Sequence, residues 1–107
     1  MLTRAITVLA LIFCSAAKAD AMDRRVRVVN DSSHAIVAFH GANSGLREWP
    51  ESLLGDEILP AGGARIFSFE DGSGYCRFRF RAVFEDGIEL IRDGVNVCEV
   101  GTYRYTD

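Results

Sequence analysis

Residues 75–85, YCRFRFRAVFE, decide the fold class because apolar and polar side chains alternate along them. Successive side chains of a β-strand point to opposite faces. The polar face carries three arginines: Arg77, Arg79 and Arg81. The other face carries Cys76 and four apolar side chains: Phe78, Phe80, Ala82 and Phe84. The alternation predicts a strand with one buried and one solvated face.

Further strand-like runs lie on both sides, separated by turn sequences such as NDSS at residues 30–33, PAGG at 60–63 and DGSG at 71–74. The runs are residues 24–30, 35–40, 57–59, 65–70, 95–100 and 102–106. We expect the first two to form a hairpin. Many short strands between turns predict an all-β domain of six to eight strands, arranged as a small antiparallel two-sheet sandwich or barrel.

One segment has helix signals. Pro50 suits a first helical position and Gly55 suits the position after a helix end. The sequence therefore predicts a short helix near residues 50–54, which would cap the core together with Trp49.

The turn after residues 75–85 can be assigned a length. A two-residue loop at 86–87 would place Glu89 on the phenylalanine face. A three-residue loop at 85–87, with Gly87 left-handed, places Glu89 diagonal to Arg81 on the solvated face. That loop pairs Phe84 with Ile88 and Ala82 with Leu90, so we predict it.

The first 19 residues have the features of a secretory signal. Arg4 provides the positive charge, residues 5–17 form an apolar run, and Ala17-Lys18-Ala19 fits the cleavage pattern. We expect cleavage after Ala19 or Ala21 and a single β-sandwich-like domain over residues 20–107. The apolar run is too short to span a membrane, so we expect no membrane span after cleavage. Phe13 before Cys14 does not suit a lipoprotein signal.

The mature chain keeps two cysteines, Cys76 and Cys98. An even pair in an exported protein predicts a disulfide, whereas a metal pair or two free thiols would be unusual. A tight hairpin at Asp93-Gly94 would put Cys98 on the wrong face to reach Cys76. We therefore predict that residues 95–100 cross to the facing sheet.

Without the signal, the chain has ten basic and fifteen acidic residues. This acidic balance argues against nucleic-acid binding. The row Arg77, Arg79 and Arg81, with Arg25 and Arg27 expected nearby, could bind carboxylate, phosphate or sulfate. The simpler interpretation is a solvated sheet face balanced by acids. Trp49, the single tryptophan, is a candidate binding residue, although core packing is the more common role.

Other chemistry has weaker support. Acidic residues in or near turns (Asp56, Glu57, Asp71, Asp86 and Asp93) could gather around calcium, but no calcium-loop spacing is present. His34 or His40 could serve a small hydrolase beside Ser32 or Ser33, but the serines have turn context. Asn30-Asp31-Ser32 spells a glycosylation sequon. We predict no cofactor or metal.

Several short motifs occur in order: Asn30 to Ser32, Trp49, Leu53 to Gly55, Leu59 to Gly62, Cys76 to Phe84, Phe84 to Gly87, and Asn96 to Cys98. In this order the chain resembles a set of short, uncharacterised exported bacterial proteins. The resemblance implies export and a disulfide-bearing β-domain, and it brings no activity with it.

These patterns favour a non-catalytic binding module, periplasmic or extracellular, with an unknown protein or anionic ligand as its partner. The alternatives are a calcium-dependent structural or adhesive module and, less favoured, a small hydrolase.

Overall fold

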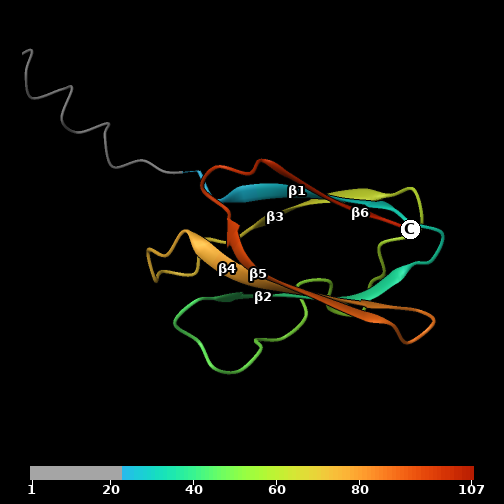
Figure 1. Ribbon diagram of the computed structural model, residues 1–107, viewed down its shortest axis with the longest axis horizontal. Coiled ribbons are helices and arrows are strands. Elements are labelled where there is room, and N and C mark those ends of the chain that lie inside the picture. Colours follow the sequence, from blue (N-terminus) through green and yellow to red (C-terminus); the bar gives the residue numbers. More distant parts are fainter. Residues whose placement is uncertain (1–22) are drawn as a thin grey trace, which may run out of the picture.

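The computed structural model describes residues 23–107, and Figure 1 shows two small sheets facing each other. One sheet has the strand order β3-β1-β6 and the other β2-β4-β5. The strands are β1 (Arg25–Asp31), β2 (Ile36–Asn43), β3 (Ala64–Ser68), β4 (Arg77–Phe84), β5 (Glu89–Asn96) and β6 (Thr102–Thr106). The prediction of an all-β sandwich of six to eight strands is confirmed. The predicted signal sequence and its two predicted cleavage positions lie outside the described residues.

The predicted hairpin after β4 has the expected register. Gly87 has φ 91°, and its amide donates to the Phe84 carbonyl at 2.9 Å. The Phe84 amide donates to the Ile88 carbonyl at 2.9 Å, and Ala82 pairs with Leu90. The three-residue loop is therefore confirmed, and with it the positions of the side chains on both faces of β4.

Aromatic side chains from both sheets fill the core. Phe39 of β2 lies 5.2 Å from Phe67 of β3 and 5.2 Å from Phe80 of β4, measured between ring centroids. Phe80 also meets Tyr103 of β6 edge to face at 5.1 Å. Each fully buried phenylalanine contributes roughly 1.5–3 kcal/mol to stability, so this cluster holds the two sheets together.

The expected hairpin between the first two strands is wrong. β1 pairs antiparallel with β3 and parallel with β6, while β2 pairs with β4 in the other sheet. The parallel pair also departs from the expected purely antiparallel arrangement. Alternation shows which side of a strand is buried, but it does not show which sheet the strand joins.

The predicted helix near residues 50–54 is also wrong, and the described residues contain no helix. The Leu53 amide donates to the Phe39 carbonyl at 2.7 Å, and the Ser52 hydroxyl accepts from the Phe39 amide at 3.0 Å. Because these groups bond to β2, they are not free for the hydrogen bonds of a helix. Leu54, 3% exposed, packs in the core. Of residues 57–59, Leu59 alone pairs, in a bridge with Ile36.

Asp93 and Gly94 form a bulge within β5 instead of a hairpin turn. Phe80 pairs with Arg92 and Phe78 with Val95, so β5 has one more residue than β4 across this interval. The extra residue changes which positions point inward, from Leu90 and Arg92 before the bulge to Val95 and Val97 after it. Residues 95–98 stay beside β4 and the segment before it, and the chain then passes to β6 in the other sheet. The prediction that residues 95–100 cross to the facing sheet is therefore wrong for most of this segment.

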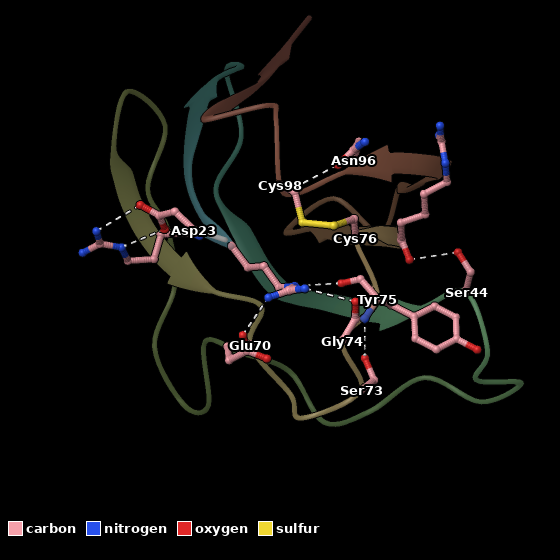
Figure 2. Close-up of a disulfide and its surroundings, with 12 residues drawn as sticks. Asp23, Ser44, Glu70, Ser73, Gly74, Tyr75, Cys76, Asn96 and Cys98 are labelled. Carbon is pink, nitrogen blue, oxygen red and sulfur yellow. Dashed lines mark hydrogen bonds and ion pairs between the residues drawn. A yellow bond between two sulfur atoms is a disulfide. The ribbon is translucent and has the colours of Figure 1, made fainter. Parts of the chain in front are cut away.

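The predicted disulfide between Cys76 and Cys98 is present, with a Cα–Cα distance of 5.3 Å (Figure 2). The Val97 amide donates to the Cys76 carbonyl at 2.8 Å, which aligns the two chain segments. Next to the bond, the Arg24 guanidinium donates to the carbonyls of Tyr75 and Gly74 at 2.9 and 3.0 Å. Arg24 therefore joins the segment before β1 to the segment before β4.

A disulfide is typical of a protein that folds in an oxidising compartment. No helix in residues 23–107 is long and apolar enough to cross a membrane.

Candidate functional site

The candidate site is the outer, solvated face of the β2-β4-β5 sheet. The three predicted arginines lie on β4, where the phenylalanines between them point into the core. His40 of β2 and Ile91 of β5 flank Arg81 on either side. We call Arg77, Arg79, Arg81 and Trp49 the arginine face. The predicted alternation places the three β4 side chains on this face.

Arg81 is neutralised within the protein. Its Nε donates to Glu89 Oε1 at 2.9 Å. Hydrogen bonding from Arg81 and its positive charge lower the pKa of the Glu89 carboxyl. The diagonal pair expected from the hairpin register is thus present, and it leaves Arg81 with less capacity for an external anion.

Arg79 and Trp49 come together, although they are distant in sequence. The guanidinium carbon of Arg79 lies 4.5 Å from the centroid of the Trp49 ring, and Nη2 donates to the Leu46 carbonyl at 3.1 Å. A cation over a tryptophan ring is stabilised by roughly 0.5–2 kcal/mol. Both side chains are half-buried, so Trp49 packs on the arginine face instead of closing the core. Leu54, and not Trp49, packs against the core at this end of the sandwich.

The loop that carries Trp49 is held by further contacts to the sheet. The Ser44 amide and hydroxyl both donate to the Arg77 carbonyl, at 3.0 and 2.9 Å. His40 Nδ1 lies 2.7 Å from the Pro50 carbonyl oxygen. These contacts fix the ends of residues 44–50, and so they fix where the Trp49 ring lies.

Arg77 is the most exposed arginine of the row. Among the described residues, its guanidinium makes one long hydrogen bond, from Nη1 to the Gly94 carbonyl at 3.4 Å. Its guanidinium donors therefore remain largely open to an external acceptor.

Arg25 and Arg27 are not near this row. They lie on β1, in the opposite sheet, where Arg27 pairs with Ile66 and Arg25 with Ser68. Arg25 is also bonded to Asp23 at 3.1 Å. The expectation of a five-arginine cluster is wrong, because β1 and β4 belong to different sheets.

A largely apolar hollow of about 350 Å³ adjoins the Trp49 loop, which was not foreseen from the sequence. Its lining includes Leu46, Pro50 and Leu53 from this loop, the buried Phe69 and Phe78, and the polar side chains of Asn43, Ser68 and Asp71. Leu46 is 44% exposed. The one indication of this hollow in the sequence is that apolar residues, Leu46 and Leu53, lie before and after Trp49, in a segment that is not helical.

Among residues 23–107, neither histidine ring makes a hydrogen bond with a serine hydroxyl. Ser32 Oγ lies 2.6 Å from Asn30 Oδ1 and 2.9 Å from the carbonyl oxygen of His34. The His34 ring faces Glu85 and Asp86, at 3.5 and 3.6 Å. The hydrolase interpretation therefore gains no paired nucleophile and base from this arrangement.

The acidic turn residues are separated from one another. Glu57 pairs with Arg65 at 2.9 Å, and Asp71 accepts from Asn43 at 2.9 Å. Within residues 23–107, no three His, Cys, Asp or Glu side chains gather closely enough to hold a metal. The calcium interpretation has no assembled site in this part of the chain.

The sequon asparagine is internal. Asn30 is 0% exposed, and its Nδ2 donates to the carbonyls of His34 and Leu59 at 2.9 and 3.1 Å. A side chain that is buried and bonded in this way is not accessible for glycosylation in the folded protein.

Comparison with known proteins gives information on the fold only. No family model and no curated protein sequence matches the chain. A protein from Eubacterium rectale, solved by NMR, is structurally similar with a TM-score of 0.52 and 12% sequence identity. The match covers 82% of this chain and 79% of that one. At this identity the likeness concerns the arrangement of strands.

Proposed function

We propose that this domain is a non-catalytic binding module that engages an anionic group of a protein or small ligand through the arginine face. The observation that carries the proposal is the stack of Arg79 on Trp49, at 4.5 Å. It combines a cation and a flat aromatic ring on a rigid sheet, next to the exposed guanidinium of Arg77.

The two arginines have different capacities. Arg77 offers most of its donors and could form a bidentate contact with a carboxylate, phosphate or sulfate. Arg79 has one nitrogen committed to the Leu46 carbonyl, so it offers fewer donors but is already held in place. Placing a binding group in advance reduces the conformational entropy lost on binding.

The apolar hollow adjoins the loop that carries Trp49, through Leu46 and Pro50, and it favours a partner with an apolar group near its anionic one. Exposed tryptophan and arginine are the side chains most often found at the energetic centre of protein interfaces. An acidic segment of another exported protein meets both requirements.

Export through the signal predicted at residues 1–19 would bring the module to its partner in the periplasm or outside the cell. The disulfide and the resemblance to short exported bacterial proteins agree with that compartment.

Partner capture from the exported fraction tests the proposal. We expect Arg77→Glu with Arg79→Glu, and separately Trp49→Ala, to lose the proteins or ligands that the native domain retains. Arg27→Glu is the matched control, because it reverses one arginine on the opposite sheet. Identical capture by the native and the doubly reversed domain would refute the role of the arginine face.

A further inference from the structure

The β5 edge of the sandwich is open. β5 and β6 are the end strands of their sheets on the same side of the molecule. Between them lie two adjoining hollows that share Leu90 and Thr106 in their linings. On the other side, residues 52–53 bond to the Phe39 backbone and cover the edge of β2.

The open edge exposes large apolar side chains. Ile88 is 55%, Leu90 44% and Ile91 56% exposed. Leu90 pairs with the fully buried Ala82, so it points to the core side of the sheet but extends past the strands that would cover it. The Tyr105 hydroxyl beside Leu90 is buried and has no hydrogen-bond partner among the described residues.

The backbone of this edge is also available for pairing. Hydrogen-bonded and non-hydrogen-bonded pairs alternate in an antiparallel ladder. Because Phe84 bonds to Ile88, the backbone groups of Glu89 and Ile91 point away from β4. An unpaired strand with apolar side chains is a template for pairing with another chain.

We propose that the β5 edge binds the β5 edge of a second copy of this chain, antiparallel about a two-fold axis with Leu90 opposite Leu90 of the second copy. The two three-stranded sheets would then form one continuous sheet of six strands. In this register Glu89 pairs with Ile91 of the second copy, so the outward backbone groups of both residues are satisfied.

The charges of the edge favour this occupant and this register. Arg92 lies opposite Ile88 of the second copy, next to the turn that carries its Asp86, and both charged side chains border the open side. The two-fold axis makes this contact twice. Glu89 is already neutralised by Arg81 at 2.9 Å, which limits its repulsion from its symmetry mate.

Shifted registers oppose like charges. Centring the axis on Glu89 places two glutamates directly opposite each other. Centring it on Ile91 places Glu89 opposite Asp93. The bulge at Asp93 and Gly94 bends the strand, so pairing is confined to residues 88–92.

The inference does not rest on the proposed function, because the edge and the arginine face are different surfaces. Where both hold, the two-fold axis places both arginine faces on the same side of the six-stranded sheet, and the dimer is bivalent.

Sedimentation velocity of the purified exported protein over a range of concentrations tests the dimer. We expect Leu90→Lys, which places two ammonium groups opposite each other, to raise the dimer Kd at least tenfold. Ile66→Lys, at a 62% exposed position on β3, is the control and should leave the Kd unchanged. A native chain that stays monomeric would overturn the proposal and leave the edge to an extended segment of a different protein.

Disulfide trapping tests the register independently of stability. Leu90→Cys should cross-link under mild oxidation, because Cα atoms of a non-hydrogen-bonded pair lie about 4.5 Å apart, within disulfide range. Ile88→Cys should not, because the equivalent atoms lie about 14 Å apart along the strand. Equal cross-linking of both variants, with the native disulfide intact by mass spectrometry, would overturn the register.

Discussion

Removing the Cys76–Cys98 disulfide should cost this domain a large share of its stability. The two cysteines are 22 residues apart. On the chain-entropy model, a loop of this length restricts the unfolded chain by an amount worth about 3 kcal/mol at 25 °C. Small domains are stable by only about 5–15 kcal/mol. The Cys76→Ala, Cys98→Ala variant should therefore fold, but its free energy of unfolding should be markedly lower.

The assays are urea denaturation and thermal denaturation, each followed by circular dichroism. Each kcal/mol corresponds to roughly 4–8 °C in Tm for a domain of this size, so we expect Tm to fall by about 15 °C. The m-value should rise, because the uncross-linked chain exposes more surface when it unfolds. Native protein reduced with dithiothreitol is the control and should match the variant.

Both cysteines are half-buried, so their replacement by alanine removes little packing. A loss of stability below about 1 kcal/mol would refute the reasoning, because it would mean that the bond does not restrict the unfolded chain. A variant that no longer folds would mean that the bond also holds the native β4–β5 contacts in place.

Three further predictions concern the hairpin, the Trp49 loop and a turn carboxylate. Gly87→Ala should lose about 1–2 kcal/mol by urea denaturation, because φ is 91° there, and Gly87→Asn should lose less. Leu54→Ala should cost about 2–5 kcal/mol, whereas Trp49→Ala, at a half-buried surface position, should cost under about 1.5 kcal/mol. Burial tends to raise the pKa of Asp71, but hydrogen bonds from Asn43 and Ser73 outweigh it and lower that pKa below its usual value. The stability advantage of the native protein over Asp71→Asn should therefore be present at neutral pH and shrink as the pH falls below about 4. An advantage that is constant from pH 7 to 3 would contradict the lowered pKa.

The β4–β5 hairpin could be predicted from the sequence because its determinants are local. The alternation of β4 fixes the buried face, and the face in turn decides between a two- and a three-residue loop. The ion pair of Arg81 with Glu89 follows from that register alone. Local rules were sufficient here because both strands lie next to each other in the chain and in the sheet.

Assignment of strands to sheets could not be predicted in the same way. β1 and β2 each have an apolar face. That face would be buried equally well whether the two strands paired with each other or joined different sheets. Asn30, which has turn chemistry in the sequence, is fully buried and bonds to the Leu59 carbonyl. This hydrogen bond joins residues 29 positions apart in the chain, at the point where the chain leaves the sheet of β1 and enters the sheet of β2.

The candidate site could be predicted only where it depends on local sequence. The three arginines of β4 share a face by local periodicity, whereas Arg25 and Arg27 were assigned to that face through the wrong hairpin. The contact of Trp49 with Arg79 depends on how residues 44–50 are bonded to β2 and β4. Bonds such as Ser44 to the Arg77 carbonyl have no signature in the local sequence.

Anion binding by the arginine face is tested most directly by chemical-shift mapping. The protein would be labelled with ¹⁵N and titrated with sodium sulfate, against sodium chloride at matched ionic strength. Anion binding at this face predicts the largest saturable shifts at the Trp49 indole N–H and at Arg77 and Arg79. Shifts confined to Arg25 and Arg27 on the opposite sheet, or no saturable shift at all, would contradict it.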